Sequence, residues 1–307
     1  MNEQAGSTPP PLPAWLAPHL PWPRRAHVLE EGPDAGRRLH LVDRPASPGG
    51  RAVLLVHGNP TWSFLWRKVI AALDPARFRA VAPDLLGFGL SDALPGLRDH
   101  SLARHADALA ELVRALDLRD LILVGQDWGG PLCTALGARL PERVTGLVLA
   151  NTSVLVPASP RGTAFHRLAR APVISDLLFR GLGFPMNALG RVQGERSSIA
   201  GDVARAYRWP LRGWRRRAGP LALARMVPSH PDHPSLPELR RGEAWARAFA
   251  GPVALVWGER DPILGRALKR HAEAFPQAPV TRTAAGHFLQ EEVPQELAAA
   301  VESVAAR

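Results

Sequence analysis

One aspartate, Asp127, occupies a sequence position that is typical of a catalytic nucleophile. Asp127 lies in the run Leu123-Val-Gly-Gln-Asp-Trp-Gly-Gly130, where an apolar strand meets a glycine-flanked turn and then a helix. This strand–turn–helix order is typical of the nucleophile elbow, and glycines at 125 and 129 leave room that a Cβ atom would fill. A carboxylate needs no base to activate it, and its attack on carbon forms an ester that water must then cleave. The run therefore predicts covalent catalysis by Asp127 rather than a helix-capping aspartate.

Two candidate hydrogen-bond donors accompany this aspartate. The run Val56-His-Gly-Asn-Pro-Thr-Trp-Ser63 follows another apolar strand, and the side-chain amide of Asn59 can aim N–H groups at an anion near Asp127. Trp128 adds one indole N–H, although simple core packing would also explain this residue. Two neutral donors that face a carboxylate could stabilise the negative charge on a departing halide or a departing carboxylate. We expect His57 to hold its loop rather than to catalyse.

A histidine and a second aspartate complete the candidate constellation. Asp261 lies in Gly258-Glu-Arg-Asp-Pro262 after a strand, and His287 lies in Ala285-Gly-His-Phe288 near the C-terminus. The chain order nucleophile, acid, histidine is that of hydrolases built on such an elbow. We expect His287 to activate water and Asp261 to orient its ring. No acid follows the strand at 144–150, and the His-Pro segment 229–234 is interpreted as a connector, not a metal site.

The elements that must position these residues alternate along the chain. Apolar strand patterns at 52–56, 78–82, 121–124, 144–150 and 253–257 are separated by helical patterns, after a hairpin-like pair at 26–30 and 38–43. This alternation predicts an α/β fold, with a mostly parallel central sheet flanked by helices. Residues 154–234 show no strand pattern and are interpreted as an inserted helical lid. The predicted organisation is a Pro-rich leader (1–25), a core in two parts (26–153 and 235–307) and the lid between them.

Composition narrows the class of protein. Of 307 residues, 46% are hydrophobic and 21% charged, which is typical of a globular domain. All but two of the 38 basic residues are arginines, so we interpret the net charge of +10 as an Arg-rich composition rather than a nucleic-acid surface. No apolar run approaches the length of a membrane span, and no secretion signal is expected in the leader. The single cysteine, Cys133, fits a cytoplasmic location.

The chain resembles the haloalkane dehalogenases of the α/β-hydrolase fold over residues 26–307. The resemblance rests on His57-Gly-Asn-Pro-Thr-Trp-Ser63, Gly125-Gln-Asp-Trp-Gly129, Trp257-Gly-Glu-Arg-Asp-Pro-Ile-Leu-Gly265 and Gly286-His-Phe-Leu-Gln-Glu291. It implies Asp127 as nucleophile, His287 as base, Asp261 as acid, and Asn59 with Trp128 as halide binders. It also implies a small apolar substrate and no cofactor or metal. The β-lactone decarboxylases of olefin synthesis are similar and share the five residues.

Several alternatives stay open or are excluded by single residues. Epoxide hydrolases use two lid tyrosines, whereas this chain has one tyrosine, Tyr207. Serine esterase chemistry fails at Asp127, and a non-enzymatic module would be free to lose the three catalytic residues. We favour haloalkanes over a β-lactone, which a wide apolar tunnel under residues 165–184 would instead indicate. Peripheral membrane contact through the leader and the Arg- and Trp-rich segment 208–217 stays an alternative to a solvated surface, and the oligomeric state is left open.

Overall fold

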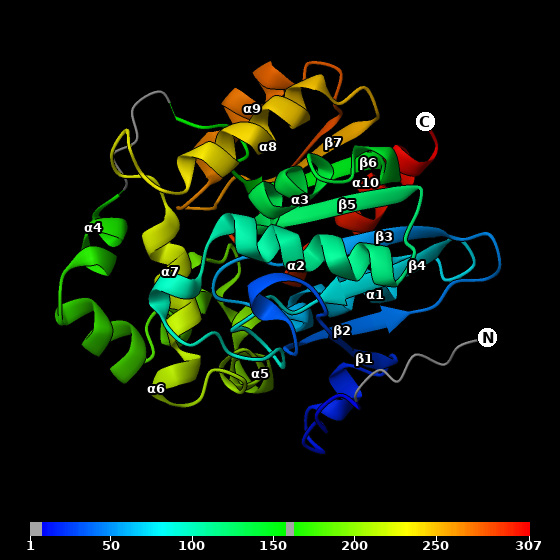
Figure 1. Ribbon diagram of the computed structural model, residues 1–307. Coiled ribbons are helices and arrows are strands. Elements are labelled where there is room, and N and C mark those ends of the chain that lie inside the picture. The colour runs from blue at the N-terminus through cyan, green and yellow to red at the C-terminus, as the bar shows by residue number, and fades with distance from the viewer. Residues whose placement is uncertain (1–7, 158–162) are drawn as a thin grey trace.

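One sheet of eight strands organises the protein. The computed structural model describes residues 8–157 and 163–307, and its strands lie in the order β1-β2-β4-β3-β5-β6-β7-β8 (Figure 1). β2 pairs antiparallel with β1 and β4, and all other pairs are parallel. The strands are β1 (Arg24–Val28), β2 (Arg38–Arg44), β3 (Arg51–Val56), β4 (Phe78–Pro83), β5 (Leu121–Asp127), β6 (Val144–Thr152), β7 (Val253–Gly258) and β8 (Val280–Thr283). The predicted mostly parallel sheet with an antiparallel start is confirmed.

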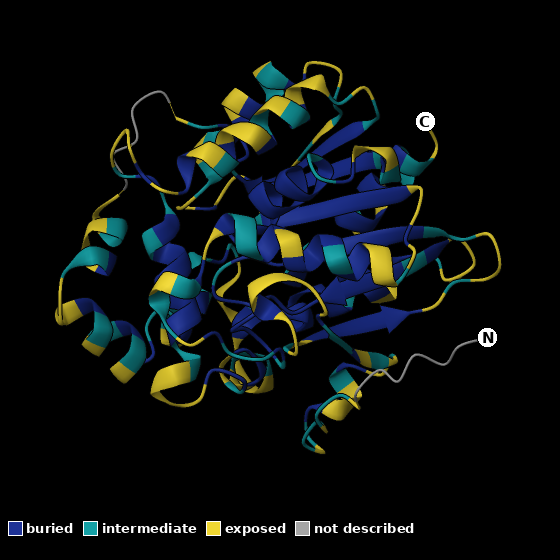
Figure 2. Cartoon of the chain, viewed as in Figure 1, coloured by how far each residue is buried: buried dark blue, intermediate teal, exposed yellow. Residues whose placement is uncertain are grey.

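Helices cover both faces of this sheet, and the central strands between them are buried (Figure 2). One face carries α2 (Leu102–Ala115), α3 (Gly129–Gly137), α8 (Leu236–Ala248) and α9 (Leu268–Ala274), and the other carries α1 (Arg67–Ala72) and α10 (Pro294–Ala305). The predicted N-cap of α2 forms, because the Ser101 hydroxyl accepts a hydrogen bond from the Arg104 N–H at 3.1 Å. Because the apolar strands lie between two layers of helices, the protein has one hydrophobic core cluster on each face of the sheet.

The lid lies between β6 and α8. Its described residues form helices and turns and no strand, as the sequence pattern indicates. They are α4 (Ala164–Arg170), a π-helical turn (Asp176–Gly181), 3-10 turns (Met186–Val192 and Arg196–Ile199), α5 (Gly201–Arg208), α6 (Gly213–Arg216) and α7 (Ala218–Met226). These helices pack beyond the carboxyl ends of the parallel strands (Figure 1). The lid therefore covers the edge of the sheet at which Asp127 lies.

The described part of the leader packs on the core. Leu16 and Leu20 are buried among the side chains of the α1 and α10 face, and Trp15 and Trp22 lie partly buried against the same cluster. The guanidinium of Arg205, in α5, stacks on the Trp15 ring at 3.9 Å. The leader is thus tied to both the core and the lid.

Some elements were not predicted. β8 is only four residues long, lies at the sheet edge and has no buried position, so it has no apolar run to reveal it. The short helices α1 and α9 were missed too, as were 3-10 turns at Ala17–His19, Gly32–Asp34, Ser63–Trp66, Leu97–Asp99, Pro141–Arg143, Gly265–Ala267 and Leu289–Glu291. No helix among the described residues is long and apolar enough to cross a membrane.

Candidate active site

The sharpest turn in the sheet holds Asp127. β5 ends at this residue and α3 begins at Gly129, and Asp127 adopts a left-handed backbone with φ of 52°. A residue other than glycine in this region is uncommon and marks a constrained position. A Cβ atom at Gly129 would lie 1.9 Å from the Val56 carbonyl oxygen, and one at Gly125 would lie 2.5 Å from the Gly129 oxygen. The predicted need for both glycines is confirmed.

The Asp127 carboxylate is held by backbone donors. Its Oδ1 accepts the Asn59 backbone N–H at 2.6 Å, and the Trp128 backbone N–H also donates to this carboxylate. A Cβ atom at Gly58 would lie 2.4 Å from Oδ1, so only glycine permits this approach. Burial raises the pKa of Asp127 above its ordinary 3.8, against the lowering effects of the His287 charge and the two N–H groups. The carboxylate is therefore poorly solvated, which leaves it reactive once ionised.

His287 and Asp261 form a buried pair beside it. The His287 Nδ1–H donates to Asp261 Oδ2 at 2.9 Å, and the other Asp261 oxygen accepts the Ile263 N–H at 2.7 Å. His287 Nε2 lies 3.8 Å from Asp127 Oδ2, beyond hydrogen-bond length. With Nδ1 protonated toward Asp261, the Nε2 lone pair faces the space beside the Asp127 carboxylate. The structure thus brings together all three predicted triad residues.

The two residues predicted to bind an anion contact this carboxylate through their backbone N–H groups. Asn59 precedes a buried loop, and its side-chain Nδ2 donates to the Pro220 carbonyl of α7 at 3.1 Å. This bond uses one of the two amide N–H groups and links the loop to the lid. Trp128 is 8% exposed and directly follows Asp127 in the chain. The donor role of its indole N–H stays a prediction.

Two amide side chains that the sequence reasoning missed hold the histidine. Gln126 Nε2 lies 3.1 Å from the His287 carbonyl oxygen and 3.3 Å from His287 Nε2. Asn151 Nδ2 donates to the Gly286 carbonyl at 2.8 Å, while its Oδ1 accepts the Gly258 N–H at 2.8 Å. Both side chains are fully buried. Only their positions could have identified them from the sequence, because Gln126 adjoins Asp127 and Asn151 lies near the carboxyl end of β6.

His57 and Tyr207 have structural partners. His57 Nε2 accepts the Leu85 N–H at 3.0 Å, which ties two loops together as expected. The Tyr207 hydroxyl donates to Glu291 Oε1 at 2.6 Å and is fully buried. The lone tyrosine is thus committed to a carboxylate outside the triad, in keeping with the exclusion of epoxide hydrolase chemistry.

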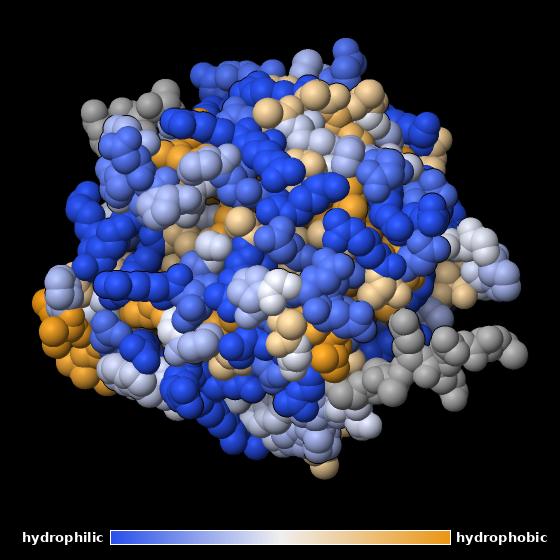
Figure 3. All heavy atoms as spheres, in the orientation of Figure 1, coloured by the Kyte–Doolittle hydropathy of each residue, from blue (hydrophilic) through white to orange (hydrophobic). Residues whose placement is uncertain are grey.

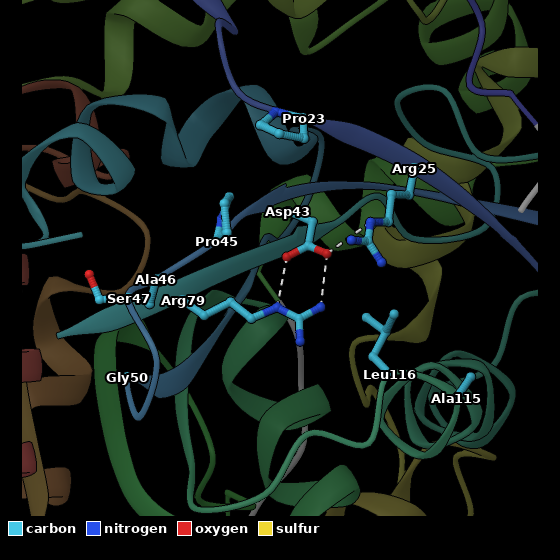
Figure 4. A pocket seen from close by; sticks show the side chains of 10 residues that line it. All are labelled: Pro23, Arg25, Asp43, Pro45, Ala46, Ser47, Gly50, Arg79, Ala115 and Leu116. Carbon is cyan, nitrogen blue, oxygen red and sulfur yellow. Dashed lines mark hydrogen bonds and ion pairs between the residues drawn. The ribbon is translucent and has the colours of Figure 1, made fainter. Parts of the chain in front are cut away.

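A surface hollow at the opposite end of the sheet is separate from this site. It has a volume of about 530 Å³ and is lined by residues that include Arg25, Asp43 and Arg79 (Figure 4). Asp43 pairs with Arg25 at 3.1 Å and with Arg79 at 2.8 Å. Arg79 lies near the start of β4, whereas Asp127 ends β5, and β3 pairs parallel with both strands. The hollow and the triad therefore lie at opposite ends of the parallel strands.

Comparison with known proteins places the chain. Residues 51–294 match the alpha/beta hydrolase fold family. The haloalkane dehalogenase of Mycolicibacterium paratuberculosis is 34% identical over 281 residues, covering 90% of this chain and 86% of that protein. The chain belongs to the haloalkane dehalogenase family. Haloalkane dehalogenase 2 of Mycobacterium tuberculosis is also 34% identical, over 86% of this chain and 90% of its own length.

A solved structure agrees with this placement in the haloalkane dehalogenase family. The tetrameric haloalkane dehalogenase DpaA of Paraglaciecola agarilytica NO2 superposes with a TM-score of 0.81 at 27% identity, covering 94% of each chain. The resemblance inferred from the sequence motifs is therefore confirmed at the level of the family and the α/β-hydrolase fold. The protein is a hydrolase.

Proposed function

We propose that this enzyme hydrolyses haloalkanes to an alcohol, a halide ion and a proton through an alkyl ester on Asp127. The observation that carries the proposal is a carboxylate at the elbow, held by a backbone N–H, that lies beside a buried histidine–aspartate pair. The relatives that are named haloalkane dehalogenases support the same reaction.

The first step forms the ester. Asp127 Oδ1 already accepts the Asn59 backbone N–H, and Oδ2 faces His287, so we assign the attack to Oδ2. Oδ2 forms a bond to the substrate carbon while the carbon–halogen bond breaks, and the bonding pair leaves on the halide. The Trp128 indole N–H and the second amide N–H of Asn59 stabilise that developing charge. Because both donors are neutral, they can release the halide afterwards.

The second step cleaves the ester. His287 Nε2 takes a proton from water, and the oxygen attacks the Asp127 carbonyl carbon. Negative charge then collects on Oδ1, which the backbone N–H of Asn59 stabilises. The bond between the Asp127 carboxyl carbon and the alkyl oxygen then breaks, and the added hydroxyl group passes its proton to that oxygen. The alcohol leaves and the carboxylate is restored. Asp261 stabilises the imidazolium until its proton passes to solvent.

A β-lactone substrate is the second candidate, since the same residues could open a four-membered ring with loss of carbon dioxide to an alkene. A wide apolar tunnel beneath the lid would favour it. Instead, the rings of Phe165, Phe179 and Phe184 pack on one another, with centroids 5.4 to 6.0 Å apart, against Leu221. We take this aromatic packing within residues 165–184 as support for the smaller substrate.

A side-by-side assay tests the proposal. Halide release from 1-bromobutane and 1,3-dibromopropane is measured against alkene formation from a cis-3,4-dialkyl-β-lactone, with Asp127→Ala as the control. We expect halide release by the wild-type enzyme and none by Asp127→Ala. Fast alkene formation with negligible halide release would replace the haloalkane with the lactone.

A further inference from the structure

Exposed apolar side chains gather on the lid. Six of the eight large hydrophobic residues that are most exposed among the described residues lie there: Leu168, Val173, Ile174, Leu177, Leu182 and Trp214, which we call the lid patch. Figure 3 shows an apolar area at the edge of the molecule where this part of the lid lies. Gly181 lies between Leu177 and Trp214, since a Cβ atom there would be 3.3 Å from one and 3.9 Å from the other. The patch is therefore continuous across two segments of the chain.

Ordinary core packing does not use these side chains. On the inner side of the same segment, Phe179 is 1% exposed and packs in the phenylalanine cluster with Phe165 and Phe184. The outer side presents Ile174 and Leu177, each 59% exposed, to solvent. Val173 is 78% exposed on a left-handed backbone with φ of 62°, a strained state for a β-branched residue. A segment that is apolar on both sides needs a second surface to cover it.

Most of the net positive charge of the protein comes from the lid segment. Lid residues 154–234 contain thirteen arginines, no lysine and four carboxylates, and so carry nine of the ten net positive charges. The interpretation of the charge as a general Arg-rich composition is thus incomplete, because the rest of the chain carries a net charge of only +1. Arg180 stacks on the Trp214 ring at 4.2 Å, and the nearby Arg212 and Arg215 are exposed.

The positive charge of the lid indicates which kind of partner could cover the lid patch. A second copy docked symmetrically through the lid patch would bring two strongly positive lids together, which is unfavourable. An anionic lipid surface is complementary to both the apolar side chains and the positive charge of the lid. Apolar side chains can enter the boundary of the acyl chains while arginines reach the head groups, and tryptophan favours that interface. Each basic residue near such a surface contributes on the order of 1 kcal/mol.

We propose that the lid patch docks this protein peripherally on an anionic lipid bilayer. The proposal goes beyond dehalogenation and does not depend on it. It also relocates the membrane contact that the sequence indicated, because Trp15 and Trp22 of the leader pack on the core and Trp209 packs on Trp62. Within the segment 208–217, Trp214 is the tryptophan that faces solvent.

Vesicle co-sedimentation of the full-length protein tests the patch. The vesicles contain either phosphatidylcholine alone or equal parts of phosphatidylcholine and phosphatidylglycerol, at low and at high salt. We expect binding to the anionic vesicles only, weakened by salt, and about tenfold weaker in the double variant Ile174→Asp with Leu177→Asp. The matched control is Val280→Asp, which changes an exposed apolar residue on β8 at the far edge of the sheet and should bind like the wild type.

A second double variant keeps the test valid if the first one fails to fold. Arg212→Glu with Arg215→Glu changes only exposed lid charges and should also lose binding to anionic vesicles, with an unchanged thermal unfolding midpoint. Absence of wild-type binding to anionic vesicles, or binding by both double variants that equals that of the wild type, would overturn the proposal. So would a wild-type dimer that Ile174→Asp with Leu177→Asp converts to monomer without any vesicle binding, which would make the patch a contact between copies.

Discussion

At the residue scale, the proposed carboxylate nucleophile asks less of its neighbours than a serine would. A serine needs a histidine within hydrogen-bond length to remove its proton. Asp127 needs none, and His287 Nε2 lies 3.8 Å away, beyond a direct bond. The proposed work of the histidine therefore falls in the second step, and the two steps can be separated by substitution.

The leaving-group donors give the first prediction. Trp128→Phe keeps an aromatic ring beside Asp127 but removes the indole N–H, so it should raise the barrier to halide release by about 3 kcal/mol. Single-turnover halide release measures this step directly. Asn59→Ala keeps the backbone N–H that holds Oδ1 and should slow the same step. Equal rates in Trp128→Phe and the wild type would remove Trp128 from the halide site.

The pKa of His287 gives a second prediction. Burial alone would lower it, but the charge and hydrogen bond of Asp261 and the charge of Asp127 raise the pKa above the ordinary 6.5. Only neutral imidazole can accept the proton from water, so ester hydrolysis should slow as the pH falls. Esterification removes the Asp127 charge, and the acid limb of ester hydrolysis should therefore lie below the His287 pKa of the free enzyme.

Asp127→Asn supplies the matched control for this prediction, because it makes the side chain neutral as the ester does. The NMR titration of His287 should move to lower pH in Asp127→Asn than in the wild type. An unchanged titration would mean that Asp127 and His287 are not coupled as their 3.8 Å separation implies.

Sequence reasoning identified the three residues that meet at the candidate site and missed the side chains that hold the histidine. Asp127, His287 and Asp261 lie in short motifs with a fixed chain order, so their meeting could be predicted. Gln126 and Asn151 are neutral amides, and their role depends on where the His287 loop passes. That position comes from tertiary packing between segments more than 100 residues apart, which no local pattern encodes.

At the element scale, a buried ionic network fastens the lid to the core. Arg67 of α1 donates to both Glu291 oxygens at 2.5 and 2.7 Å, and the Tyr207 hydroxyl of α5 donates to the same carboxylate. Glu291 ends the 3-10 turn Leu289–Glu291, close to His287 in the chain. One carboxylate thus links a lid helix, a core helix and the histidine loop.

Tyr207→Phe tests this network. It keeps the ring that packs on Phe64 at 5.3 Å but removes a hydrogen bond to a buried charge, so the free energy of unfolding should fall by about 2 kcal/mol. Denaturant unfolding measures the loss. Halide release should stay within about threefold of the wild type, since no reacting atom contacts this hydroxyl in the proposed mechanism. Loss of turnover without loss of stability would give Tyr207 a part in the chemistry.

The elements that could be predicted are those with long apolar runs. The central strands β3, β5, β6 and β7 are buried on both faces and show continuous hydrophobic sequence. The edge strand β8 takes its place from pairing with β7 rather than from its own residues. Most of the lid could be assigned only as a helical region, because its turns depend on contacts with the core.

At the scale of the whole molecule, buried neutral histidines set the acid limit of stability. Burial lowers the pKa of His271 to about 4, and its Nε2 accepts the Val154 N–H at 3.1 Å. The unfolded chain binds this proton from about pH 6.5 downward, whereas the folded protein binds it only near pH 4. Stability is therefore lost between these values, by about 3 kcal/mol for this residue.

His271→Gln should flatten that dependence. The free energy of unfolding, measured by denaturant titration at neutral pH and at about pH 4.5, should differ less in the variant than in the wild type. His100, whose pKa burial also lowers to about 4, keeps part of the acid sensitivity in both proteins. The same pH dependence in variant and wild type would show that His271 can be protonated without cost to the fold.

The central claim is that Asp127 forms a covalent alkyl ester that His287 then hydrolyses. Mass spectrometry of the His287→Phe protein after incubation with 1-bromobutane or 1,2-dibromoethane tests it most directly, because the first step should proceed and the second should fail. We predict one alkyl group on the peptide that contains Asp127, and no such adduct in Asp127→Ala. An adduct on another residue, or full turnover without His287, would contradict the account.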